Sequence, residues 1–169
     1  MLPINVSMGI CQGYMPLVGY NYASKNYKRM WAISRFAWIC SLIFSAACVL
    51  GAWLFSESII ALFIDHKATV ELGAKFLRIA SLGVPLTVVN FLIAYGLQAM
   101  GLGKPSFILS ATRLGLLNIS ITLLLDHYFG MFGVISGQPV MEIFAFLVSG
   151  TVYYVILRRL MATLKTKPA

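Results

Sequence analysis

One acidic side chain, Glu142, lies well inside an otherwise apolar stretch that runs from about Val134 to Leu157. A carboxylate surrounded by hydrocarbon is costly, and residues of this kind are functional candidates by default. At this position a carboxylate could carry a proton, bind a cation, or supply negative charge to a cavity. The structural alternatives are a neutral, hydrogen-bonded Glu142 or one that faces a water-filled cavity.

Arg113 is the natural partner to consider for this carboxylate. Arg113 lies about six residues, and Glu142 about fifteen, above the expected cytoplasmic ends of their segments, so their depths differ by roughly 13 Å. We therefore expect no direct pairing. We expect Arg113 to extend toward the cytoplasm or to a lipid phosphate instead.

Amide side chains also occur within the apolar segments. Asn90 and Gln98 share one segment, and Gln138 lies one turn before Glu142 in another. Together these four residues are the candidate substrate and cavity residues. The same side chains could equally serve as hydrogen bonds between packed helices. Aromatic residues are plentiful, and ring faces in a cavity can attract aromatic cations.

The sequence offers no site for catalysis or for a metal. No nucleophile lies beside a base, and His66 and His127 both fall in expected outward loops. Cys40 and Cys48 are eight residues apart, which is roughly 12 Å on one helix and too far for a disulfide. We expect no enzyme activity, no metal and no resident cofactor.

The composition indicates an integral membrane protein. Apolar residues make up 60% of the chain and charged residues 11%, against about 45–50% and about 25% in soluble domains. The formal net charge of +8 does not indicate nucleic acid, because the basic residues gather at the ends of apolar segments. That placement makes the lipid bilayer the expected partner.

The apolar segments predict an all-α, polytopic membrane protein with four full transmembrane helices and one partial N-terminal helix. Each segment is long enough to cross the hydrocarbon core. We expect helices because lipid cannot form hydrogen bonds with an exposed backbone. Residues 1–20, which contain Pro3 and Pro16, are expected to be the tail of a span or a poorly formed one. Residues 65–78 are expected to form a loop or a short surface helix. The four predicted spans are Phe36–Ile64, Ile79–Met100, Phe107–Leu125 and Val134–Leu157.

Charge then gives an expected topology. Ten basic residues fall on one side of the spans and three on the other, so the side with ten should be cytoplasmic. We expect a multi-pass protein of the plasma or inner membrane with a cytoplasmic C-terminus. The expected parts are the end of a truncated helix (1–22), a cytoplasmic basic loop (23–35), a four-helix part (36–157) and a cytoplasmic basic tail (158–169).

Three stretches resemble the multidrug and toxic compound extrusion (MATE) family, most closely its bacterial MepA-like and DinF-like branch. Gln98–Pro105 resembles the hairpin between helices ten and eleven, and Gly130–Glu142 the entry to helix twelve. Ala23-Ser24 departs from the Gly-Ala that usually follows Asn-Tyr in the family. The most specific stretch resembles the family's repeated signature and contains Gln12, Gly13, Pro16, Gly19, Tyr20, Asn21 and Tyr22.

The resemblance implies the C-terminal part of a 12-helix, two-lobed antiporter that exports organic cations or other xenobiotics against Na⁺ or H⁺. It implies that the missing N-terminal helices are partners, and that this chain is inactive alone. The span Ile79–Met100 lacks the acid that some members use for cations, so we expect the coupling-ion site to lie outside this chain. Two alternatives are a related flippase of lipid-linked sugars and a small membrane scaffold.

Overall fold

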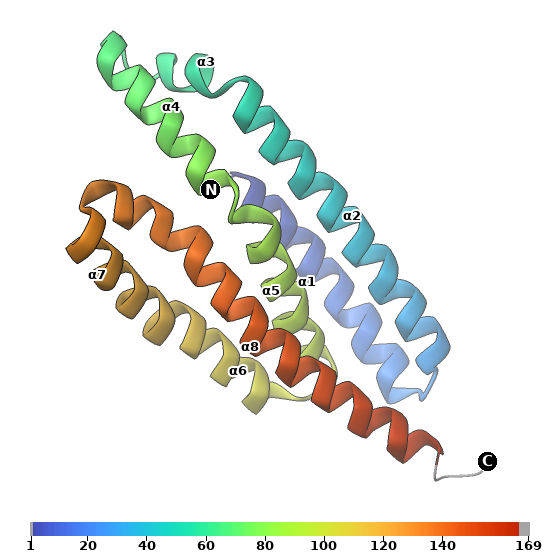
Figure 1. The fold of residues 1–169 in the computed structure, drawn as a ribbon. Helices are drawn as coiled ribbons and strands as arrows, with labels where there is room; N and C mark the ends of the chain where they lie inside the picture. Colours follow the sequence, from blue (N-terminus) through green and yellow to red (C-terminus); the bar gives the residue numbers. More distant parts are fainter. Residues whose placement is uncertain (1, 166–169) are drawn as a thin grey trace.

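The computed structural model describes residues 2–165, with side chains described for residues 4–158. The described chain is helical throughout, and the helices lie roughly along one common direction (Figure 1). The elements are α1 (Leu2–Ala23), α2 (Tyr27–Leu54), α3 (Ser56–Ala61), α4 (Lys67–Ser81), α5 (Val84–Ala99), α6 (Gly103–Ala111), the π-helical segment η1 (Thr112–Leu117), α7 (Asn118–Phe129) and α8 (Met131–Lys165).

The prediction of an all-helical protein with four full spans is confirmed. Four helical stretches of the described chain are long and apolar enough to cross a membrane. They extend beyond the apolar segments because helix continues through the flanking basic residues. Residues 2–23 form one continuous helix, α1, which contains Pro16. The four stretches are Tyr27–Leu54, Lys67–Ala99, Gly103–Phe129 and Met131–Arg158.

The predicted basic loop over 23–35 is wrong for most of its length. Helix α2 already begins at Tyr27, where the Asn26 side chain accepts a hydrogen bond from the Arg29 backbone N–H at 3.2 Å. The sharp turn falls on Lys25, whose φ is 59°, whereas Ala23 ends α1 within the helix. Ala23 stands where the family usually has glycine, and it causes no backbone strain because its φ is not in the left-handed region.

Two other expected boundaries also change. Residues 158–165 of the expected tail continue helix α8, while residues 166–169 lie outside the described residues. Of the two forms expected for residues 65–78, a loop or a short surface helix, the structure has a helix over residues 67–78 in α4, which leads directly into the second span. Between α4 and α5 the helix is interrupted at Leu82 and Gly83, and Pro85 falls in the first turn of α5, where its missing N–H is tolerated.

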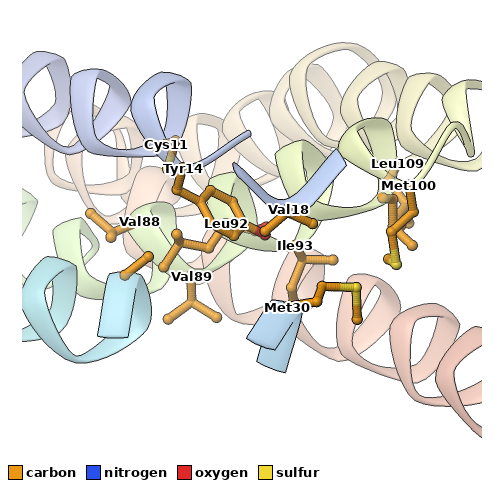
Figure 2. Packing of buried hydrophobic residues seen from close by; sticks show 12 residues of the cluster. Cys11, Tyr14, Val18, Met30, Val88, Val89, Leu92, Ile93, Met100 and Leu109 are labelled. Atoms are coloured by element: carbon orange, nitrogen blue, oxygen red, sulfur yellow. The ribbon is translucent and has the colours of Figure 1, made fainter. Parts of the chain in front are cut away.

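The core is organised around α5, which packs against α1, α2 and α8. Its buried side chains meet those of α1, with Leu92 and Tyr14 lying close together in Figure 2. Helices α1 and α5 lie so close together that a Cβ on Gly96 would collide with the Tyr14 hydroxyl. The three cysteines are free thiols, and Cys11 is fully buried in this core.

Helices α7 and α8 pack tightly through glycine. A Cβ on Gly133 would collide with the backbone carbonyl of Leu125, and one on Gly137 would meet Thr122 at 3.5 Å. The Gly-x-x-x-Gly spacing of Gly133 and Gly137 thus lets the two helices approach closely. Gly9 and Gly13 have the same spacing in α1, but nothing in the described chain lies within 4 Å of a Cβ on either of them.

This packing predicts opposite effects for one substitution at two glycines of α8. Gly133→Ala should destabilise the chain by about 1–3 kcal/mol, because a backbone carbonyl cannot move aside as a flexible side chain can. Gly150 has open space around it, so Gly150→Ala should stabilise by up to about 1 kcal/mol through helix propensity. Unfolding by SDS titration in micelles measures both. Equal effects of the two substitutions would contradict the packing described here.

Candidate functional site

The side chain of Glu142, on α8, is 1% exposed and accepts hydrogen bonds from two other elements. The Arg113 guanidinium, carried by η1, reaches Oε1 through Nη2 at 2.6 Å and through Nε at 3.2 Å. From α5, the Nδ2 of Asn90 donates to Oε2 at 2.7 Å. Both carboxylate oxygens therefore have charged or amide donors, which a buried carboxylate requires.

The network continues beyond the carboxylate in both directions. The Ser149 hydroxyl, two turns after Glu142 on α8, donates to Oδ1 of Asn90 at 2.6 Å. On the other side, the Arg113 guanidinium lies 4.6 Å from the centre of the Phe91 ring, in a cation–π contact. Four polar side chains thus tie α5, η1 and α8 together in a satisfied buried network.

The prediction that Arg113 and Glu142 would not pair is wrong. That prediction compared depths from the cytoplasmic ends of the two segments, but α8 extends much further past that end than α6 does (Figure 1). Counted from their shared turn at Gly130, Arg113 is 17 residues and Glu142 12 residues away. Five residues correspond to roughly 7 Å along a helix, which the long arginine side chain spans.

A cavity of about 420 Å³ lies beside the ion pair, within the size range of ligand pockets. Its wall combines the ion pair, an aromatic ring, amide and hydroxyl groups, and aliphatic side chains. Such a wall could hold an aromatic compound that carries a few polar groups. The residues that line it are Ile4, Thr87, Phe91, Arg113, Leu114, Asn118, Thr122, Val134, Gln138, Met141 and Glu142.

The structure brings three of the four candidate cavity residues together. Gln138 and Glu142 line the cavity. Asn90 does not line it, but donates a hydrogen bond to the Glu142 carboxylate. Gln98 is exposed near the end of α5, roughly 12 Å along the helix from Asn90, and does not line this cavity. Sequence reasoning missed the contribution of Ser149, although its seven-residue spacing from Glu142 places both on one helix face.

Three residues of the N-terminal motif, Gly19, Asn21 and Tyr22, make contacts near the end of α1. The Cα of Gly19 lies so close to α5 that a Cβ there would be 3.1 Å from the Ala99 carbonyl oxygen. Asn21 is buried, and its side chain donates to the Leu17 carbonyl at 2.7 Å. The ring of Tyr22 packs edge-on against Tyr27 at 6.0 Å. The other motif residues, Gln12, Gly13, Pro16 and Tyr20, face outward and are exposed.

A family profile described as MatE matches residues 1–124. The chain belongs to the MATE family. This agrees with the resemblance of the three motifs and with the absence of a catalytic constellation, because MATE is a family of transporters and not of enzymes. Family membership together with the four apolar helices of the described residues makes this a membrane protein of a multi-pass transporter family.

The chain is similar over most of its length to a curated multidrug exporter. It is 26% identical over 158 residues to the multidrug export protein MepA of Staphylococcus aureus, strain MRSA252. That alignment covers 94% of this chain but 35% of the relative. The chain therefore spans about a third of the length of the curated relatives that it matches.

Solved structures support the fold. The inward-facing conformation of a multidrug resistance MATE family transporter matches with a TM-score of 0.87, 21% identity, and coverage of 99% of this chain and 39% of that one. The bent form of the Vibrio cholerae MATE transporter VcmN gives 0.83 at 19% identity, covering 94% and 36%. The inward closed lipid II flippase MurJ gives 0.73 at 22% identity, covering 99% and 34%.

Proposed function

We propose that this MATE chain forms part of a multidrug exporter, and that the cavity beside the Arg113–Glu142 pair contacts the transported compound. One observation carries the proposal: a cavity of ligand size has a buried ion pair, an aromatic ring and amide groups on one wall. The expected substrates are organic cations or other xenobiotics. Export would be driven by Na⁺ or H⁺, and the +8 net charge concentrated near the expected inner face supports a cytoplasmic C-terminus.

We further propose that the coupling ion binds outside this chain. Both oxygens of Glu142 are already occupied by Arg113 and Asn90, so a cation would have to displace an arginine to reach them. The relatives contain about twice as many further residues as this chain covers. Transport by alternating access requires two opposed lobes, so we propose that these further helices are needed for export.

The flippase alternative receives less support from the geometry. A pyrophosphate group requires uncompensated cationic side chains, and Arg113 is the cation that lines the cavity. Its charge is balanced by Glu142 at 2.6 Å and its face is covered by Phe91. The likeness of folds between MATE transporters and a flippase does not change this local balance.

Reconstitution in proteoliposomes tests the proposed function with ethidium, an aromatic organic cation, under an imposed Na⁺ or pH gradient. The isolated chain should give no uptake above empty liposomes. A chimera that adds the region of the Staphylococcus aureus MepA protein beyond the matched segment should give gradient-driven uptake. Uptake by the isolated chain would contradict the need for further helices.

A pair of phenylalanine variants in the same chimera tests the cavity. Phe91→Ala removes a ring that lines the cavity, and should lower ethidium uptake about tenfold or more through lost aromatic contact. Phe107→Ala is the matched control, because Phe107 is 73% exposed on the outside of α6. An equal loss in both variants would exclude the cavity as the substrate contact.

A further inference from the structure

We propose that a groove between α2 and α8 is a specific binding site for an anionic phospholipid, whose phosphate lies at Arg35 and whose acyl chain follows the groove. This inference concerns the outer surface of the bundle and does not depend on the proposed transport function. Four observations carry it: a periodic stripe on α2, the volume and lining of the groove, the charge balance at this end of the molecule, and two indole N–H groups.

The stripe alternates cations with tryptophans along one face of α2. Lys28, Trp31, Arg35, Trp38 and Leu42 are separated by three, four, three and four residues, the spacing that keeps side chains on one side of a helix. From the start of α2 inward, two Lys/Arg–Trp pairs are followed by the aliphatic Leu42. Indole rings and basic side chains are the residues that favour the headgroup level of a bilayer.

The lining of the groove is mostly apolar and includes one guanidinium, which suits an alkyl chain with an anionic headgroup. Its volume is about 430 Å³, and Trp31, Ser34, Arg35, Trp38, Ile39 and Tyr153 line it. The rings of Trp38 on α2 and Tyr153 on α8 stack, with centroids 6.2 Å apart and planes at 26°. This aromatic pair joins the two helices and gives the groove an apolar wall beside the single guanidinium of Arg35.

The charge at this end of the bundle has no protein counterion within the described residues. The ion pairs among the described residues, Arg78–Glu57 and Arg113–Glu142, involve other side chains. The elements that carry the exposed acids, α3, α4, their connection and the end of α7, lie at the opposite end (Figure 1). The exposed cations near the start of α2 and its neighbours are Lys25, Lys28, Arg29, Arg35, Lys104 and Arg158.

The indole N–H groups give a second reason to expect an acceptor in the groove. Trp53, at the other end of α2, donates its N–H to the Arg78 carbonyl at 3.3 Å. Among the described residues, Trp31 and Trp38 have no comparable acceptor. A phospholipid supplies phosphate oxygens to the guanidinium and indoles, and alkyl chains to the apolar wall. Free phosphate would leave the apolar wall uncovered.

Quenching of tryptophan fluorescence by brominated lipids tests the proposal, because the chain has only three tryptophans. The full chain with Trp53→Phe keeps Trp31 and Trp38 as reporters of the groove. The chain with Trp31→Phe and Trp38→Phe keeps Trp53 as a reporter of the opposite end. Each is reconstituted in mixed bilayers, and dibromo-phosphatidylglycerol is compared with dibromo-phosphatidylcholine of the same chain length.

The expected result is a preference for phosphatidylglycerol of about fivefold at the groove reporters, the effect of one cation on an anionic lipid, and little preference at Trp53. Arg35→Gln should abolish the preference. Arg29→Gln is the matched control: it removes the same charge from the same end of α2, but Arg29 does not line the groove.

Equal losses in Arg35→Gln and Arg29→Gln would overturn the site and leave only general attraction to anionic lipid. Equal quenching by the two lipids would also overturn it. If neither lipid quenched the groove reporters, another protein segment or a second copy of the chain would have to cover the groove, and the proposal would fail. Size-exclusion profiles and helical content check that each variant is folded before quenching is compared.

Discussion

Arg113→Gln is expected to destabilise the folded chain by about 3–5 kcal/mol, because it leaves the Glu142 carboxylate buried without its charged partner. The carboxylate is 1% exposed and the arginine side chain 11% exposed, so water cannot replace the lost donor readily. The same change also removes the cation from the face of Phe91. SDS titration in micelles, followed by loss of helical circular dichroism, measures the free energy of unfolding.

Two further variants distinguish the loss of the Arg113–Glu142 ion pair from a general effect of removing an arginine. Arg78→Gln removes an arginine from an exposed pair, in which the two side chains are 40% and 67% exposed, and should cost at most about 1 kcal/mol. The double variant Arg113→Gln with Glu142→Gln removes both charges and should recover most of the loss. The ion pair would not be structural if Arg113→Gln were as mild as Arg78→Gln, or if the double variant were the least stable.

Asn90→Leu should give the second large effect, a loss of about 2–4 kcal/mol. The amide is 4% exposed, donates to Glu142 and accepts from Ser149. Replacing it leaves a carboxylate oxygen and a hydroxyl without these partners, and each unsatisfied buried group costs about 1–3 kcal/mol. The same unfolding measurement applies.

Asn118→Leu is the matched control for that substitution. Asn118 is exposed, and its hydrogen bond with Thr122 is at the surface, so the change should stay within about 0.5 kcal/mol. Similar losses at positions 90 and 118 would show that the amide of Asn90 does not hold the network together.

The sequence predicts the class and the number of spans well, because hydropathy over about 20 residues is a direct consequence of bilayer thickness. It predicts the ends of helices poorly. The first span starts at Tyr27 and not near Phe36. Basic residues such as Arg29 and Arg35 are tolerated in a helix at the membrane–water interface. Apolar content alone does not mark that boundary.

The candidate site could be predicted in part. Glu142 and Asn90 stand out as polar groups in apolar segments, and both belong to the network. The partnership with Arg113 could not be read from depth, because it depends on how far each helix extends beyond the bilayer and on the one-residue turn at Gly130. The outward position of Gln98 likewise depends on which face of α5 meets the core.

The turn at Gly130 also bears on how the chain enters the membrane during synthesis. Arg113 leaves the ribosome before Glu142, so a one-by-one insertion of the last two spans would put a lone cation into lipid while its counter-charge was still unmade. Gly130, with a φ of 57°, closes α7 and α8 into a tight hairpin. We expect that hairpin to insert as one unit, because both charges would then enter the lipid together as an ion pair.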